Sequence, residues 1–211
     1  MAAETALMSI VPATPEDNRN PEKRPGRPRS DKSRDAILDA TRKMLMHTPL
    51  RDISIEAVAK RAGVGKTTIY RWWPHKAALV MEAFMAQPGL QNILPTTPDA
   101  SEALKVQLEK LIRQLRGQNG RIVANIIAEA QAEPEALRLL NENFLNERVN
   151  NLRNHLEAGK EDGLFNRQLD SAMVIDQLLG PIFYRLLTNP DALDERFTGH
   201  YPEQVVNTLK A

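Results

Sequence analysis

The chain has 211 residues, of which 42% are hydrophobic, enough to bury a substantial core and to exclude a globally disordered protein. It has no cysteine, which excludes a disulfide framework, thiolate catalysis and Cys-based zinc sites. No apolar run approaches the roughly 20 residues that span a bilayer, and residues 1–18 carry acids but no basic segment of the kind that opens a signal peptide. We therefore expect a cytoplasmic protein with no membrane partner.

The net charge of +1 conceals a strong asymmetry along the chain. Between Arg19 and Lys76 there are 15 Lys or Arg and 6 Asp or Glu, a net charge of +9. Residues 1–18 carry −3 and residues 77–211 carry −5. This division predicts one unit that binds a polyanion and a second unit with a different task.

The first predicted helices occupy the basic segment. Residues 1–29 contain five prolines and no helical periodicity, so we expect a flexible leader that ends in a basic arm. Apolar residues then recur at helical spacing from Ser30 or Asp31 until His47. Ser54 is a suitable N-cap for a second helix, which Gly63 would close in a left-handed conformation. A third helix is predicted over 66–72 and a fourth from about 75 to just before Pro88.

Beyond a Pro- and Thr-rich loop, only helical patterns follow. We expect helices over 101–115, 122–133, 171–188 and 202–210, with a break at the glycines of 117–120. A long helix is also expected from about 137 to an end near 159–163. Pro181 is expected to kink its helix. No segment shows strand alternation worth assigning, and we predict an all-α fold.

Residues 53–76 have the properties of a helix-turn-helix. Ala59 and Gly63 are small where two helices must cross, and an apolar seam fixes the crossing through Val58, Val64, Ile69 and Trp73. The polar and aromatic side chains that remain outward could reach base edges in the major groove: Lys66, Thr67, Thr68, Tyr70, Arg71 and Trp72. Lys76 opens the next helix, where a cation and free backbone amides suit a phosphate.

Three stretches carry a family resemblance: residues 36–41 (AILDAT), 62–64 (AGV) and 68–79 (TIYRWWPHKAAL). They resemble the DNA-binding domain of the TetR family of bacterial transcription regulators, specifically over 31–84 and in layout beyond. The resemblance implies a three-helix helix-turn-helix domain over 30–87 and a helical ligand-binding and dimerisation domain over 88–211. It implies base or backbone contacts from the six outward residues named above, and phosphate contacts from Ser54 and Lys76.

Several of these residues have a second interpretation. Tyr70 could be a core aromatic, Arg71 and Lys66 could be solvated charges, and Ser54 could serve only as a cap. Trp73 stands at a position where the family usually has a buried aromatic, so it is assigned to the core. Trp72 replaces a common histidine and either stacks on a sugar or packs.

The arm at 24–29 (RPGRPR) supports a separate hypothesis. It resembles the Gly-Arg-Pro core of an AT-hook, and Arg27 and Arg29 would then enter the minor groove. A disordered basic tail with non-specific attraction to DNA is the equally weighted alternative.

One helix-turn-helix reads too few base pairs to select a genomic site, which predicts a homodimer on a palindromic operator. The resemblance implies that the last two long helices, at 171–188 and 202–210, form the dimer interface, and that the C-terminal helices bind an inducer that releases the operator. Residues that interrupt or flank apolar stretches are the candidates for an unidentified small-molecule inducer: Asn125, Glu129, Asn143, His155 and Tyr184. For each of them a structural hydrogen bond is the competing interpretation.

An enzyme is the principal alternative from another class. The four histidines are scattered without paired metal-ligand spacing, and no Gly-rich phosphate loop follows a strand. We therefore expect no catalytic activity, no metal and no cofactor. An architectural DNA-binding protein, or an activator without inducer control, stays open as an alternative to a repressor.

Overall fold

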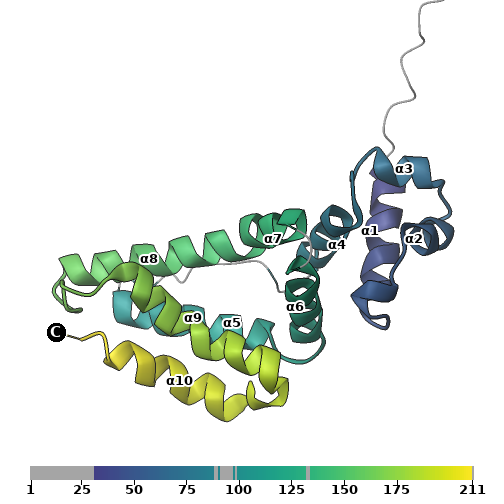
Figure 1. The fold of residues 1–211 in the computed structure, drawn as a ribbon. Helices are drawn as coiled ribbons and strands as arrows, with labels where there is room; N and C mark the ends of the chain where they lie inside the picture. The colour runs from purple at the N-terminus through teal and green to yellow at the C-terminus, as the bar shows by residue number, and fades with distance from the viewer. Residues whose placement is uncertain (1–30, 88–89, 91–96, 98, 132–133, 211) are drawn as a thin grey trace, which may run out of the picture.

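The computed structural model describes residues 31–87, 90, 97, 99–131 and 134–210, and it is built of helices (Figure 1). The basic segment forms α1 (Asp31–Leu45), the 3-10 turn η1 (Leu50–Asp52), α2 (Ile55–Ala62), α3 (Lys66–Tyr70) and α4 (Lys76–Met85). The remainder forms α5 (Ala100–Gln114), α6 (Gly117–Ala130), α7 (Pro134–Leu140), the π-helical turn η2 (Asn141–Leu145), α8 (Asn146–Glu161), α9 (Ser171–Thr188), the 3-10 turn η3 (Pro190–Ala192) and α10 (Glu195–Asn207). In these parts of the chain, β-pairing is limited to an isolated bridge between Phe165 and Lys210. The all-α prediction is confirmed.

Helices α1 to α3 form a small head around the apolar face of α1. Ile37, Ala40 and Leu45 of that face are buried, and the hydroxyl of Thr41 donates to the carbonyl of Ile37. Because this side-chain bond stays within the helix, Thr41 is buried without leaving its hydroxyl unpaired. The buried face of α1 packs against both α2 and α4.

Helix α4 connects the head to the helices that follow it, α5 to α10, which form the body of the protein. It packs against α1 on one side and against α7 and η2 on the other. Its residues Leu79, Val80, Met81 and Ala83 are buried, and the ring of Phe84 lies 6.0 Å from the ring of Phe144 in η2. A helix that packs against neighbours on two sides buries apolar residues around most of its circumference, which explains why α4 has only one acidic and one basic residue.

The body is a bundle in which α8 runs antiparallel to α5, with α9 beside α8 and α10 along α5 (Figure 1). Gly159 permits the close approach of α8 to the start of α5, because a Cβ there would collide with the ring of Phe165 and press on Ala100. None of the helices in the described parts of the chain is long and apolar enough to span a membrane.

Three helix boundaries differ from the sequence expectation. The glycines at 117–120 do not separate two helices but lie in the first turn of α6. Gly117 adopts φ 63° and starts α6, and a Cβ at Gly120 would collide with the carbonyl of Leu115. The glycines therefore build a tight corner between α5 and α6. The last helix begins at Glu195 rather than near 202, because the carboxylate of Asp194 accepts the amide of Phe197 and caps it.

The long helix predicted from about 137 to an end near 159–163 does end there, at Glu161, but it is not a single regular helix. It consists of α7, the π-helical turn η2 and α8, which follow one another without a gap. A π-helical turn shifts the hydrogen-bond register within a helix and often lies at a functional position. α9 remains helical through Pro181.

Candidate nucleic-acid interface

Local sequence signals position α2 and the turn after it. The hydroxyl oxygen of Ser54 accepts the amide of Ala57 at 3.1 Å, which satisfies one of the free donors at the start of α2. At the other end Gly63 adopts φ 68°, a left-handed conformation that glycine takes without strain. Both caps were predicted from the sequence, and together they fix the length of α2 and the direction of the turn into α3.

The crossing of α2 and α3 is fixed by buried apolar side chains. Val58, Ile69 and Trp73 are buried, and Val64 packs against them from a half-buried position. α3 spans only Lys66–Tyr70, and Arg71 is its C-cap. This short helix is held on one side and faces solvent on the other, as the reading helix of a helix-turn-helix must be.

The outward face of α3 carries hydrogen-bond donors, acceptors and positive charge. Lys66, Thr67, Tyr70 and Arg71 are exposed, and Thr68 is half-buried. Tyr70 has 51% of its surface exposed, so it is not a core aromatic. These side chains lie on the solvent side of α3, the side from which a helix reads a groove.

Lys66 forms an exposed ion pair across the two helices. Its ammonium donates to a carboxylate oxygen of Glu56 at 2.9 Å. This bond raises the pKa of Lys66 and lowers the pKa of Glu56. The lysine is therefore charged, and Glu56 places a negative charge at the edge of the reading face.

Trp72 packs against the head. Its ring lies 6.2 Å from the ring of Trp73, and the guanidinium of Arg34 in α1 lies over it at 5.6 Å. The carboxylate of Glu82 in α4 pairs with Arg34 and also accepts the indole N–H of Trp73 at 2.6 Å. Glu82 thus joins three parts of the head, a role that the sequence analysis did not assign.

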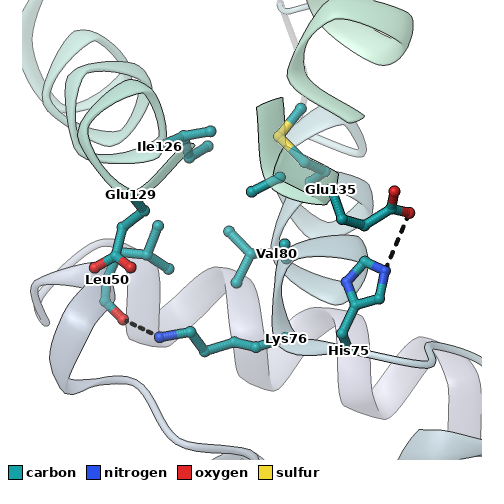
Figure 2. A pocket seen from close by; sticks show the side chains of 10 residues that line it. Leu50, His75, Lys76, Val80, Ile126, Glu129 and Glu135 are labelled. Atoms are coloured by element: carbon teal, nitrogen blue, oxygen red, sulfur yellow. Dashed lines mark hydrogen bonds and ion pairs between the residues drawn. The ribbon is translucent and has the colours of Figure 1, made fainter. Parts of the chain in front are cut away.

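Lys76 forms a hydrogen bond within the head. The ammonium of Lys76 donates to the carbonyl of Leu50 at 3.2 Å and points toward η1 (Figure 2). Its expected phosphate contact stays a prediction and requires this side chain to turn outward. Arg27 and Arg29 lie outside the described residues.

A cavity of about 160 Å³ lies between α4, η1, α6 and α7 (Figure 2). Its wall includes Leu50, Val80 and Ile126, with polar groups at its rim. One ring nitrogen of His75 lies 3.3 Å from a carboxylate oxygen of Glu135. Arg138 in the first place, and His75 after it, lower the pKa of Glu135 to about 2, so its carboxylate is ionised at neutral pH. The cavity therefore lies where the head meets the body and is bordered by an inter-helix polar contact.

Comparison with known proteins decides the family. Residues 37–83 match the family model described as bacterial regulatory proteins, tetR family. Residues 94–205, more than half of the chain, match the model described as Tetracyclin repressor-like, C-terminal domain. The chain belongs to the TetR family. It is a transcriptional regulator with a DNA-binding helix-turn-helix, as the resemblance implied.

Relatives and solved structures agree with this assignment. The chain is 29% identical over 185 residues to the HTH-type transcriptional regulator YdeS of Bacillus subtilis, which covers 88% of this chain and 92% of YdeS. It is 22% identical to the regulator AqdR of Rhodococcus erythropolis, over 72% of this chain and 73% of AqdR.

Among solved structures, the TetR family regulator SCO0332 superposes with a TM-score of 0.65 at 26% identity, over 85% of this chain and 100% of the other. The regulator FadR of Bacillus subtilis, solved in complex with stearoyl-CoA, superposes with a TM-score of 0.66 at 21% identity, over 82% and 98% of the two chains. Its similarity bears on the fold alone.

For this TetR-family member, the five residues predicted to contact an inducer do not form one site. Asn125 and Glu129 lie together on α6 and line a hollow beside η1. Asn143 is exposed and donates to the carbonyl of Leu139, and Tyr184 has 68% of its surface exposed on α9. His155 is half-buried on α8. Their contact with a ligand stays a prediction. Among the residues that the structure describes, no group of His, Asp and Glu is arranged to hold a metal ion.

Proposed function

We propose that this protein is a ligand-responsive repressor that binds a palindromic operator as a homodimer and leaves it when a small molecule binds. In this proposal residues 30–87 read DNA and residues 88–211 dimerise and bind the ligand. The observation that carries it is α4, whose buried residues pack against α1 of the head and against α7 of the body. A change in the body therefore has a packed route to the head.

The proposed dimer interface is an apolar stripe on α9. Met173, Tyr184 and Leu187 have 73%, 68% and 52% of their surface exposed. They share one helix face with Gly180, because the intervals along the helix follow the spacing of three, four and seven residues. A Cβ at Gly180 would meet no atom within 4 Å, so a second helix has room to approach there.

α8 is the companion of α9 in this proposal. The half-buried side chains of Leu145, Val149, Leu179 and Phe183 line a hollow between α8 and α9, which extends the apolar surface. The expected companion was the last helix. Its outward residues Arg196, His200 and Glu203 are polar, however, and its apolar side packs on α5. An apolar surface of this kind is more suitable for a permanent interface than a charged one.

The test of dimerisation is the mass in solution by light scattering. Tyr184→Asp combined with Leu187→Asp places two charges in the interface and should give a monomer with unchanged helicity. Leu164→Asp is the matched control, because Leu164 is 43% exposed but lies outside α9. A double variant that keeps the mass of the wild type would exclude this face.

The test of operator recognition is selection of random duplex DNA, followed by titration of the selected duplex and a scrambled duplex across salt concentrations. We expect a palindromic winner that binds at least a thousandfold more tightly than the scrambled duplex. Equal affinity for the two would contradict sequence-specific recognition. The complex of the structural neighbour FadR with stearoyl-CoA supports the small-molecule part of the proposal. Loss of the operator complex on adding a compound that binds the body would test that part directly.

A further inference from the structure

A buried arginine lies at the centre of the body. Arg148 at the start of α8 has only 4% of its surface exposed. Its guanidinium donates to the carbonyl of Phe144 at 2.7 Å, to the carbonyl of Leu90 at 2.9 Å and to the side-chain oxygen of Gln114 at 3.3 Å. Within the described parts of the chain, no carboxylate pairs with it. The guanidinium also lies over the ring of Phe144, 4.0 Å from its centroid. These contacts stabilise the cation, but a buried cation normally has an anionic partner as well.

The same helix pair buries further polar groups without partners. α5 and α8 are antiparallel, and the contact between Gln114 and Arg148 sets their register. Two helical turns further along, Gln107 and His155 fall opposite one another, since a step of seven residues returns to the same face of each helix. Gln107 is 5% exposed, and neither its side-chain nitrogen nor its oxygen has a hydrogen-bond partner; the Nε2 atom of His155 is buried without one as well.

The electrostatic environment of this layer is positive. Lys110 lies on α5 between Gln107 and Gln114, and burial together with the nearby Arg148 lowers the pKa of Lys110. Burial lowers the pKa of Arg148 to about 10, against the smaller and opposite effect of the Glu147 carboxylate. Burial also lowers the pKa of His155, which is therefore neutral near pH 7. Burial thus disfavours the charged form of each basic side chain in the layer. An anion between the two helices would favour these charged forms.

We propose that the layer formed by Gln107, Lys110, Gln114, Arg148 and His155 binds the carboxylate of a small organic acid whose body is apolar. The inference deepens the proposed function, on which it rests, by naming the chemical class of the inducer. Arg148 uses one Nη1 donor and both Nη2 donors in the bonds above. Its Nε–H is left to donate a single bond to one oxygen of a carboxylate. Gln107 and His155 supply the neutral hydrogen bonds that the free protein leaves unmade, and binding separates these two side chains by the width of the carboxylate.

The surroundings determine the rest of the ligand. Phe144, Leu108, Leu111 and Leu152 around the layer are all buried and apolar. Because they are packed together, these side chains must move apart to admit a ligand. A ligand body with few polar atoms would then be accepted there, whereas a sugar or a peptide would leave its own polar groups unpaired. The ligand therefore belongs to the alkyl or aryl carboxylates.

The layer also adjoins α4. Arg148 donates to the carbonyl of Leu90, and the amide of Leu90 donates to the carbonyl of Gln87, two residues after α4 ends. The side-chain nitrogen of Gln87 is buried without a partner. A carboxylate that draws Arg148 toward itself would thus alter the support of the C-terminal end of α4.

The decisive variant is Gln107→Leu. It removes two unpaired buried atoms, so the thermal midpoint of the free protein should rise or stay unchanged. In the same variant the affinity for a carboxylate should fall about tenfold, the effect of one lost hydrogen bond to a charged group. A residue with only a structural role would not change both quantities in opposite directions. Gln204→Leu on the exposed side of α10 is the matched control and should change neither.

The probes are decanoate and 2-naphthoate, each compared with its neutral amide by calorimetry on the full-length protein. We expect one or both carboxylates to bind and their amides to bind at least tenfold more weakly. Arg148→Met should abolish the preference for the carboxylate, provided that its circular dichroism matches the wild type. Failure of both carboxylates to bind at 1 mM, an amide that binds equally well, or Gln107→Leu with lower stability and unchanged affinity would each overturn the inference. The last outcome indicates a structural water as the partner of Gln107.

A separate measurement distinguishes this inference from the proposed function. The operator duplex is titrated with and without the bound carboxylate. Carboxylate binding without operator release supports the site and contradicts its role as the inducer site. Operator release by a neutral compound that competes with neither carboxylate supports inducer control and overturns the ligand class.

Discussion

The imidazole of His75 lies 3.3 Å from the carboxylate of Glu135, a residue that follows it by 60 positions (Figure 2). The other ring nitrogen, Nδ1, accepts the amide of Ala78 at 3.3 Å and so caps α4. Because Nδ1 is an acceptor, the proton of the neutral ring resides on Nε2 and is donated to Glu135. One side chain therefore caps the helix that leaves the head and attaches it to the first turn of α7.

The two roles of His75 can be separated by substitution. His75→Ala removes both and should lower the free energy of unfolding by about 1 kcal/mol or more. His75→Asn keeps an N-cap and loses only the contact with Glu135, an exposed pair whose effect should be the smaller of the two. Urea unfolding of both variants, each with and without Glu135→Gln, measures the coupling. Strict additivity of His75→Asn and Glu135→Gln would show that the contact contributes nothing in solution.

The pH dependence of stability should carry the signature of Glu135. Its pKa is about 2 in the folded protein, below the ordinary value of 4.5, chiefly because of Arg138 and further because of His75. A depressed carboxyl pKa stabilises the fold above the unfolded value and loses this effect as the pH falls toward the folded value. Glu135→Gln should therefore be less stable than the wild type at pH 7, and the difference should shrink between pH 4.5 and pH 2.

The matched control for that measurement is Glu203→Gln, which removes an exposed carboxylate on α10. Its difference from the wild type should be small across the same range. A Glu135→Gln variant whose deficit is constant from pH 7 to pH 2.5 would contradict the depressed pKa.

Charge at the edge of the reading face should tune DNA affinity. Lys66→Gln removes a cation from α3 and should weaken binding and reduce the salt dependence by about one phosphate contact. Glu56→Gln removes the carboxylate that pairs with Lys66 at 2.9 Å and should strengthen binding at low salt. Fluorescence anisotropy on the selected operator at several salt concentrations checks both. Equal salt slopes for wild type and Lys66→Gln would exclude a phosphate contact from this lysine.

The indole of Trp73 should contribute more than its hydrophobic burial. Trp73→Phe keeps an aromatic in the seam but loses the bond to Glu82 at 2.6 Å. A hydrogen bond to a charged group contributes about 1.5–3 kcal/mol, so the free energy of unfolding should fall by about that amount. Glu82→Gln combined with Trp73→Phe should lose much less than the sum of the two single changes.

The sequence predicted a structural feature correctly where the interactions that decide it are local. The caps at Ser54 and Gly63 act within one helical turn, and the helix-turn-helix followed from them. The corner at Gly117 and Gly120 depends on contact with the preceding helix, and the cap at Asp194 competes with a proline signal further on. For these boundaries the pattern alone predicted the wrong residues.

The inducer candidates show the same limit more strongly. Polar residues beside apolar runs were selected, but a run does not reveal which of its faces another helix covers. Tyr184 thus lies on an exposed face, whereas Arg148 and Gln107, which the sequence analysis did not single out, are buried. The heptad interval shared by 107 and 114 on α5 and by 148 and 155 on α8 is the signal that could have found them.

The 10 residues of α4 act mechanically as a lever. At 1.5 Å per residue the helix is about 15 Å long, so a tilt of about 10° about the Phe84 end would displace the His75 end by about 2–3 Å. In a twofold assembly that displacement would occur twice, once in each head. Successive major grooves on one side of a duplex recur every 34–36 Å or so, and a mismatch of about 5 Å would leave both reading helices out of phase with the DNA.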